Sequence, residues 1–537
     1  MTVLPAPTLA GDGTHVAEAA RELIAAMMLE PTGRITPSVY ETGRLVSDAP
    51  WLTGHGRRLT HLLVTQRPDG GWGAPGGYSV VPTVSAVEAL LSALRAAPGG
   101  PRRADLAAAA GRGLAVLSGW LADGPSLPDT PAADLIVPAL VERINGQLAR
   151  FGERPDGWPR ALPGVDRRRL DALHALLAAG RPVPLKLLHA FEVLGPAALR
   201  RPDITPVAGA VGASPAATAA WVSAGGGPGL HRTALAYLEA AVGQHGGPVP
   251  CCTPITVFER GWTLSTLSRA GVPFRAAPKL VAELAAALGP QGTPTGPGLP
   301  ADADTTSVTL YALARLGHPV EPTSLLGYDL GSHFCTWQGE DGSSVTTNAH
   351  VLEALGWHVR HTVSGADRYR ARTAALARWL CDIQQPDGCW ADRWHASPYY
   401  ATSCVVLALD GYAPTGAAAA VDRAVDWVLA TQRADGAWGR WSGTAEETAY
   451  ALHVLLGVRG PARRGVRDAV RRGLAYLETT DSRRDDPPLW HDKDLYTPVL
   501  IVRAAVVAAR QLALTTSDPG WAAAAGPASG ASMIRGA

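Results

Sequence analysis

Apolar residues recur at intervals of three and four along most of the chain, the spacing that places them on one face of an α-helix. The pattern is clearest over Val84–Leu94, Ala371–Asp382 and Ala445–Leu456. The strict alternation typical of a half-buried strand is nearly absent, and glycine- and proline-rich turns separate the helical segments. The pattern predicts an all-α protein made of helical hairpins, arranged as a solenoid or a closed toroid.

A seven-residue motif, Q-x-x-D-G-x-W, occurs at Gln66–Trp72, Gln384–Trp390 and Gln432–Trp438. Each copy follows one predicted helix and precedes another. Asp-Gly favours a tight turn, because glycine adopts positive φ at no steric cost. We expect the Gln to bond backbone groups and the Trp to pack beside it, so that each motif braces neighbouring helices.

Composition and charge limit the possible functions. The chain is 47% hydrophobic and 18% charged, which is sufficient for a large core, and a length of 537 residues allows roughly two to four domains. With a net charge of +1 and no basic stripe, nothing in the sequence suggests a nucleic-acid binder. The most apolar stretch, Val499 to Leu514, is interrupted by Arg503 and Arg510, which argues against stable membrane insertion.

The six cysteines lack the C-x-x-C spacing of a zinc or redox site and are few for this length, which favours a reducing compartment. The first residues lack the basic and apolar regions of a secretory signal. We therefore expect a cytoplasmic protein. The sequence does not specify its oligomeric state.

Candidate chemistry is concentrated in the segment Asp302-Ala-Asp304-Thr305-Thr306, which precedes a predicted helix over Ser307–Gly317. Helix capping alone would explain one of these aspartates. The pair also suits an acid that must stay protonated near neutral pH, because burial and a second carboxylate both raise the pKa of an aspartic acid. We interpret Asp304 as a proton donor and Asp302 as the partner that tunes it.

Together these motifs resemble the class II terpene cyclases. The Q-x-x-D-G-x-W repeats are similar to the QW motifs of that family, and D-x-D-T-T is similar to its D-x-D-D acid motif, in which the middle Asp delivers the proton. The D-x-D-T-T variant resembles that of a bacterial subset that includes enzymes similar to drimenyl diphosphate synthase. The resemblance extends in order from about residue 38 to about residue 510 through five further segments: Ser38–Thr42, Leu188–Glu192, Ser214–Ala219, Gly246–Trp262 and Trp490–Tyr496.

The resemblance implies an all-α fold with two αα-barrel domains, the βγ architecture of class II terpene cyclases. Residues 1–45 would begin the β domain, residues 46–290 would form an inserted γ domain, and residues 291–520 would complete the β domain with the acid motif. We expect residues 521–537 to be a disordered tail.

The resemblance also suggests roles for individual residues. Thr346 and His350 would support the catalytic acid, with His350 replacing an Asn of plant relatives. His189 matches a family histidine that removes the final proton with an Asn, but the Asn position falls at Cys251. Lys493 matches a lysine that contacts the diphosphate.

Cofactor and cavity residues follow from the same resemblance. The family uses Mg²⁺ through an acidic segment whose counterpart here is incomplete, and Asp129 is its candidate ligand. A carbocation is stabilised by aromatic faces, so Trp221, Trp262 and Trp337 are candidates for the cavity lining.

We therefore expect protonation-initiated cyclisation of farnesyl diphosphate to drimenyl diphosphate, with the diphosphate retained because no D-D-x-x-D motif is present. Cyclisation of geranylgeranyl diphosphate to a copalyl- or labdadienyl-type diphosphate is the first alternative. A protein prenyltransferase β-subunit would need a zinc site and a partner chain. A non-catalytic helical scaffold is another alternative, and its function would not depend on Asp304. An (α/α)₆ glycosidase is a further one, but it would not explain why the motifs occur in the order of the family.

Overall fold

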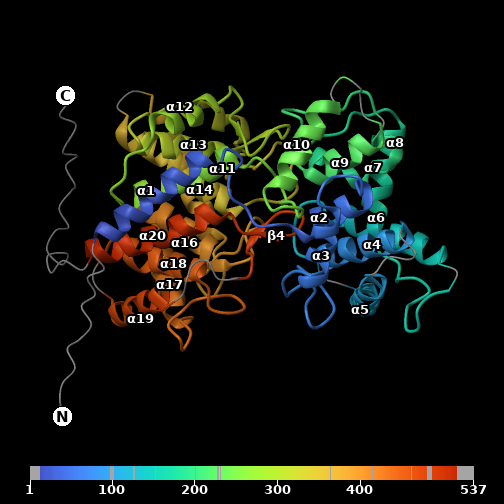
Figure 1. The fold of residues 1–537 in the computed structure, drawn as a ribbon. Helices are drawn as coiled ribbons and strands as arrows, with labels where there is room; N and C mark the ends of the chain where they lie inside the picture. The colour runs from blue at the N-terminus through green and yellow to red at the C-terminus, as the bar shows by residue number, and fades with distance from the viewer. Residues whose placement is uncertain are drawn as a thin grey trace, which may run out of the picture.

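The structure is a computed structural model that describes residues 13–96, 102–124, 127–151, 153–199, 201–225, 229, 231–362, 365–413, 416–460, 463–479 and 486–516. The segment 521–537, which we expected to be disordered, lies outside these residues. The described chain is all-α apart from two small hairpins, as predicted, and forms two helical lobes that lie side by side (Figure 1).

The inserted lobe has one continuous core, which extends from Tyr40 to Val249. Its elements are α2 (Val39–Asp48), α3 (His55–Val64), α4 (Val80–Ala96), α5 (Arg103–Ala122), α6 (Ala133–Ala149), α7 (Arg168–Ala178), η1 (Leu185–Val193), α8 (Pro196–Leu199), α9 (Pro215–Ser223) and α10 (His231–Gly243).

The split lobe is built from both ends of the described chain. Its elements are α1 (Gly13–Leu29), α11 (Thr256–Arg269), α12 (Pro278–Ala286), β1 (Thr293–Pro294), β2 (Ala301–Asp302), α13 (Ala303–Arg315), η2 (Thr323–Tyr328), α14 (Val345–His361), α15 (Asp367–Asp382), α16 (Pro398–Tyr412), α17 (Ala418–Ala430), α18 (Ala445–Gly457), α19 (Val466–Thr479), β3 (Trp490–His491), β4 (Leu495–Tyr496) and α20 (Val499–Thr516).

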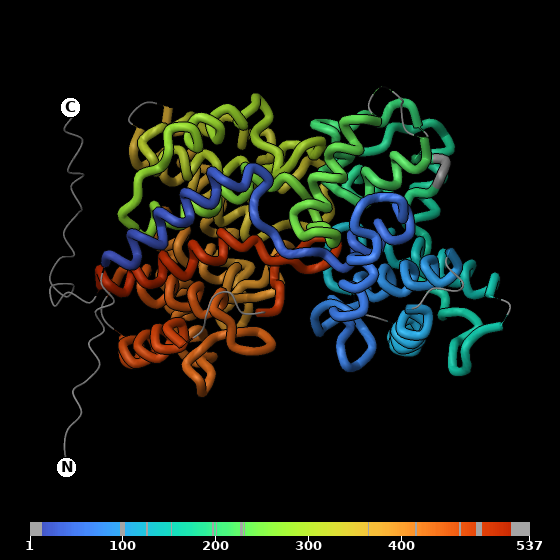
Figure 2. The backbone as a smooth tube through the Cα atoms, viewed as in Figure 1, coloured from blue at the N-terminus to red at the C-terminus, as the bar shows by residue number. Residues whose placement is uncertain are grey.

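The first and last helices of the split lobe lie side by side, so the chain leaves this lobe after α1 and returns to it at α11 (Figure 2). The core of α1 and α20 also contains Leu264 and Leu267 of α11 and Leu280 of α12. Helices α11 and α12 therefore belong to the split lobe, although we expected residues up to 290 in the inserted domain. Helix α20 is long and apolar enough to cross a bilayer, but half of it is buried against neighbouring helices.

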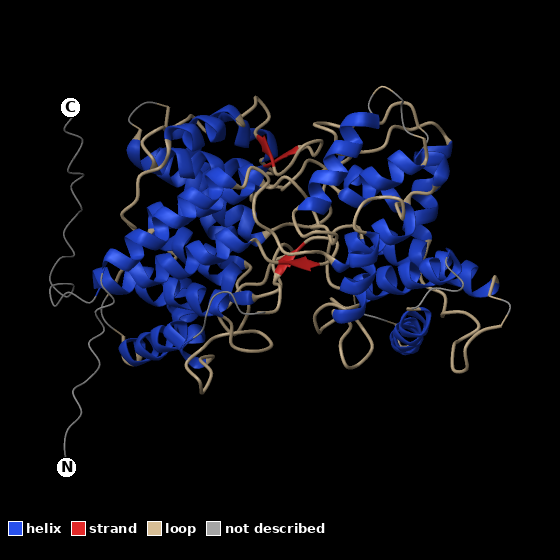
Figure 3. Cartoon of the chain, in the orientation of Figure 1, coloured by secondary structure: helices blue, strands red, loops and turns tan. Residues whose placement is uncertain are grey.

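Two short antiparallel hairpins lie between the helical masses of the lobes (Figure 3). The pairing of β1 with β2 places Thr293 opposite Asp302 and so fixes the entrance to α13. The pairing of β3 with β4 holds the loop that carries Asp492 and Lys493. The hairpins therefore bring the candidate chemistry to the space between the lobes.

The QW motifs form the same contacts in all three copies. The side-chain amide of Gln384 donates to the carbonyls of Gly388 and Ala420, at 2.7 and 2.9 Å. The indole of Trp390 donates to the carbonyl of Leu380 at 2.8 Å. Gln66 with Trp72, and Gln432 with Trp438, repeat this arrangement. Each motif therefore bonds the end of one helix to the backbone of a neighbouring one.

Candidate active site

Asp302 begins α13 as its N-cap and is 2% exposed. Its carboxyl group accepts hydrogen bonds from the Thr305 amide at 2.6 Å and from the Thr295 hydroxyl at 3.0 Å. Burial, reinforced by the charge of Asp304, raises the pKa of Asp302 from 3.8 to about 7. Asp302 is therefore both a helix cap and a carboxyl group that binds a proton near neutral pH.

Thr305 occupies the position where the D-x-D-D motif has its third acid. Its hydroxyl lies 2.8 Å from the hydroxyl of Thr295, which in turn bonds Asp302. A carboxylate at position 305 would crowd a third negative charge into this buried group. The threonine keeps the hydrogen bonding without that charge.

Asp304 and His350 form a close pair across α13 and α14. The Nδ1 atom of His350 lies 2.6 Å from Oδ1 of Asp304, and their side chains are 7% and 16% exposed, respectively. Burial alone would lower the pKa of His350, but the Asp304 carboxylate outweighs it and raises that pKa well above 6.5. The pair therefore retains a shared proton at neutral pH, next to the small part of Asp304 that remains accessible.

An aromatic belt, defined here as Phe258, Trp262, Tyr400, Tyr450 and Trp490, lies beside this pair. The ring of Trp262 meets His350 edge-on at a centroid distance of 5.4 Å, and its indole N–H donates to the Tyr400 hydroxyl at 2.8 Å. Phe258 packs on Trp262 at 4.4 Å. An acid beside aromatic faces can protonate an alkene and stabilise the resulting carbocation.

Trp337 lies near the acid motif through its neighbour Thr336, whose carbonyl accepts the Ala303 amide at 3.0 Å. Its ring meets that of Trp394 edge-on at 5.3 Å. Trp221 differs from the prediction, because it is fully buried in the core of the inserted lobe and serves packing. Of the three predicted lining residues, Trp262 and Trp337 lie near the acid.

Thr346 does not support the acid as expected. Its hydroxyl donates to Asp392 at 2.8 Å, and the same carboxylate accepts the amides of Val345 and Thr346 at 2.6 and 3.1 Å. Asp392 therefore binds the first turn of α14, next to its N-cap Ser344, and orients the helix that carries His350. Asp392 was not predicted, although it follows the second QW motif by two positions.

The surroundings of His189 also differ from those expected of the predicted base. Its Nδ1 lies 2.7 Å from the Gly212 carbonyl and its Nε2 lies 2.7 Å from Asp492. Burial lowers the pKa of His189, but Asp492 outweighs it and the net pKa is raised. Since both neighbours are acceptors, both ring nitrogens carry hydrogen, and the imidazolium cannot take another proton.

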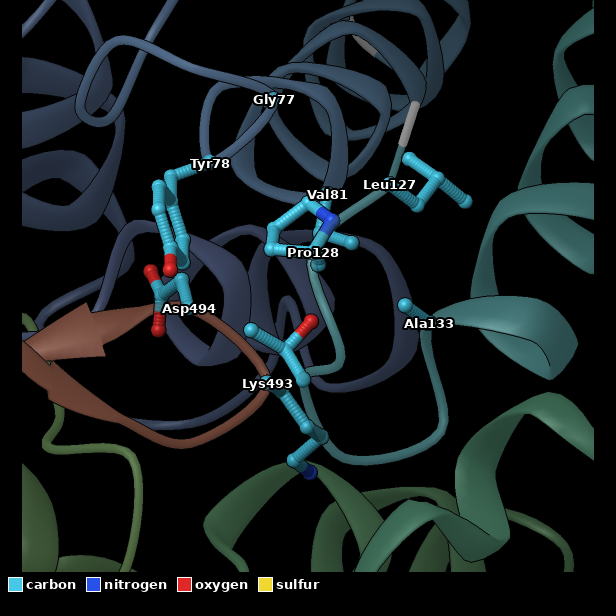
Figure 4. Close-up of a pocket in the computed structure, with 9 residues that line it drawn as sticks. Gly77, Tyr78, Val81, Leu127, Pro128, Ala133, Lys493 and Asp494 are labelled. Carbon is cyan, nitrogen blue, oxygen red and sulfur yellow. The ribbon is translucent and has the colours of Figure 1, made fainter. Parts of the chain in front are cut away.

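Lys493 is fully buried, and its ammonium pairs with Glu41 and Glu192 while donating to the His189 carbonyl at 2.7 Å and to Ser214 at 2.9 Å. A small pocket lies beside its backbone, between Tyr78, Pro128 and Ala133. Figure 4 shows the side chain extending away from the pocket. Contrary to the prediction, Lys493 joins the lobes and offers no free cation to a diphosphate.

Asp129 lies between the lobes, where its two carboxylate oxygens are 3.0 and 2.8 Å from Arg393. Magnesium prefers an octahedral set of oxygen ligands, whereas this single carboxylate is already neutralised by a guanidinium. Asp129 therefore does not fit a protein-held Mg²⁺ site.

One group of potential metal ligands was found among the described residues, formed by Cys251, Cys252 and Asp492. All three are buried, and burial raises the pKa of the Cys251 thiol well above 9.0. A metal would have to displace the thiol protons and compete with His189 for Asp492. A prenyltransferase-type zinc site uses Asp, Cys and His ligands, and this group lacks the His ligand because Gly212 and Asp492 engage both ring nitrogens of His189.

Comparisons with known proteins identify the family. The family model of the squalene-hopene cyclase C-terminal domain matches residues 339–499. An ent-copalyl diphosphate synthase from Streptomyces sp. (strain KO-3988) is 44% identical over 491 residues, covering 91% of this chain and 94% of that protein. A labda-7,13-dienyl diphosphate synthase from Streptomyces clavuligerus is 42% identical over 513 residues, covering 91% of each chain.

The solved structure of ent-copalyl diphosphate synthase from Streptomyces platensis superposes with a TM-score of 0.86 at 43% identity, covering 93% of this chain and 99% of that one. The chain therefore belongs to the class II terpene cyclases, as the sequence motifs predicted. It is an enzyme that cyclises a prenyl diphosphate in a reaction initiated by protonation.

Proposed function

We propose that this enzyme cyclises geranylgeranyl diphosphate to a bicyclic labdane-type diphosphate. The observation that carries the mechanism is the Asp304–His350 pair beside the aromatic belt. Full-length relatives at 40–44% identity are named for copalyl and labdadienyl diphosphates, which supports the C20 substrate. The farnesyl prediction depended on the D-x-D-T-T variant alone, and these relatives do not support it.

In this proposal Asp304 donates a proton to the terminal alkene of the substrate. The transferred proton is the one that Asp304 shares with His350, and it leaves through the Asp304 carboxyl group as His350 becomes neutral. The alkene π electrons form the new C–H bond, two ring closures follow, and loss of a proton gives the product. The carbon–oxygen bond to the diphosphate stays intact, so substrate and product are isomers.

The test is incubation of the purified enzyme with geranylgeranyl or farnesyl diphosphate, followed by dephosphorylation and mass spectrometry. We expect a bicyclic C20 alcohol from the first substrate, with one deuterium incorporated when the reaction runs in D₂O. Turnover of farnesyl diphosphate alone would overturn the choice of substrate. Monocyclic or ionised products would overturn the class II mechanism.

Mg²⁺ is proposed to enter with the diphosphate and not through Asp129. Chelation with EDTA should lower the turnover, and added Mg²⁺ should restore it. The Asp129→Asn variant should keep the same Mg²⁺ dependence, because its carboxylate is paired with Arg393. A large increase in the Mg²⁺ requirement of this variant would instead assign Asp129 to the ion.

A further inference from the structure

Glu446 is a buried carboxylate that neither the acid pair nor the QW motifs explain. It lies in the first turn of α18 and is 3% exposed. One of its oxygens, Oε1, accepts three hydrogen bonds: from the indole of Trp490 at 2.7 Å, and from the Tyr450 hydroxyl and Nε2 of His395, both at 3.2 Å. Within the described residues, its second oxygen, Oε2, has no hydrogen-bond partner.

The contacts of His395 show which of its ring nitrogens carries the hydrogen. The Ser397 amide donates to Nδ1 of His395 at 3.0 Å, so Nδ1 carries no hydrogen. Nε2 must then carry the ring hydrogen and donate it to Glu446. Three donors converge on one oxygen, the arrangement that suits a carboxylate, and all three come from neutral side chains, while the other oxygen is left to accept a proton.

The same donors connect Glu446 with the acid. The ring of Tyr400 lies 4.6 Å from that of His395, 4.8 Å from Trp490 and 5.1 Å from Tyr450. Tyr400 accepts the indole N–H of Trp262, which packs against His350. A continuous series of ring contacts therefore joins the proton donor to the carboxylate of Glu446.

We propose that Glu446 is the base that ends the cyclisation, an inference that rests on the proposed function. The electrons of a C–H bond next to the cationic carbon become the new double bond, and the proton moves to Oε2 of Glu446. Asp304 has supplied one proton and Glu446 has received one, so no other reactant is needed. In this role the negative charge of Glu446 also stabilises the cation before the proton is lost. His395 and Trp490 are positioning residues.

The matched pair of variants is Glu446→Gln and Glu447→Gln. Glu447 is the adjacent buried carboxylate, but it accepts from Thr444 and from the Arg440 amide, and among the described residues no hydrogen bond joins its side chain to the belt. We expect Glu446→Gln to lower kcat by about 10²–10⁴-fold and to shift the product towards other double-bond isomers or a hydrated alcohol. Glu447→Gln should keep the wild-type kcat and product. Wild-type kcat and product in a folded Glu446→Gln enzyme would overturn the assignment.

A second variant covers the case in which Glu446→Gln does not fold. Tyr450→Phe removes one donor to Glu446 and leaves the aromatic ring in place, and it should lower kcat several-fold with KM unchanged or alter the product ratio. Unchanged kcat and product would overturn the assignment here as well. If the wild-type enzyme converts no prenyl diphosphate, the proposed function itself fails. If the wild type is active and these variants match it, only the role of Glu446 fails.

Discussion

The Nδ1 atom of His350 lies 2.6 Å from Oδ1 of Asp304, which joins α14 to α13 at the acid. Burial opposes the charge on His350, but Asp304 outweighs it and raises the His350 pKa well above 6.5. Because the pKa of His350 is higher in the folded state than in the unfolded state, protonation of His350 stabilises the fold. This stabilisation is complete below the unfolded-state pKa near 6.5 and is lost as the pH rises through the folded-state pKa.

The corresponding variant is His350→Gln. The difference in unfolding free energy between wild type and variant should be fully present at about pH 6.5 and just below it, and should shrink towards alkaline pH. Urea denaturation at a series of pH values measures it. A difference that stays constant across this range would contradict the charged pair.

Asp304→Asn removes the transferable proton and keeps the size of the side chain. We expect kcat to fall by about 10²–10⁴-fold in a protein that still folds, although it loses the stabilisation that the charged pair with His350 provides. Asp329→Asn is a matched control, because Asp329 is similarly exposed (15%) and paired with Arg372. Its kcat should stay near the wild-type value. Equal effects of the two variants on kcat would favour a scaffold over an acid catalyst.

Asp302→Asn should stabilise the protein while lowering its activity. Burial and the charge of Asp304 raise the Asp302 pKa from 3.8 to about 7, so ionisation of Asp302 costs the folded state up to about 4 kcal/mol above pH 7. Asn still caps α13 but carries no charge. The gain in unfolding free energy should therefore be present at pH 8 and absent near pH 4. If the variant is less stable than the wild type at pH 8, ionisation of Asp302 costs the folded wild-type protein no free energy, which would contradict the prediction.

The fold could be predicted because its determinants are local. Helical periodicity and the Gln384–Trp390 motif each specify contacts between neighbouring helices, and the structure shows those contacts. The acid motif is also local, since the N-cap of α13 places Asp302 and Asp304 within one turn. His350 could be identified only through the resemblance, because it is 46 residues away from its partner.

The errors concern residues whose surroundings come from the other lobe or from distant loops. Lys493 has the right residue type for a diphosphate, but Glu41 and Glu192 of the inserted lobe neutralise it. His189 meets Asp492 more than 300 positions away. Glu446 resembles any acidic residue in a first helical turn, and only the folded chain shows the aromatic donors around it.

Lys493→Met should destabilise the protein and leave substrate binding nearly unchanged. The substitution leaves Glu41 and Glu192 buried without their cation, which costs about 3–5 kcal/mol. Lys279→Met is the control, because Lys279 is 68% exposed and only loosely paired with Glu283. Denaturation should separate the two variants, and KM should match wild type in both. A large rise in KM for Lys493→Met alone would restore the diphosphate-binding role.

Gly388→Ala should disrupt the second QW motif. Gly388 has φ of +102°, and a Cβ atom there would lie 2.6 Å from the carbonyl oxygen of Arg423. Gly365 also has positive φ, at +77°, but its Cβ would meet nothing within 4 Å. Gly365→Ala therefore costs only the backbone strain of about 1–2 kcal/mol, whereas Gly388→Ala adds a clash between α17 and the turn that Gln384 bonds. Thermal denaturation should rank Gly388→Ala clearly below Gly365→Ala, and equal melting temperatures would show that the turn can move away from α17.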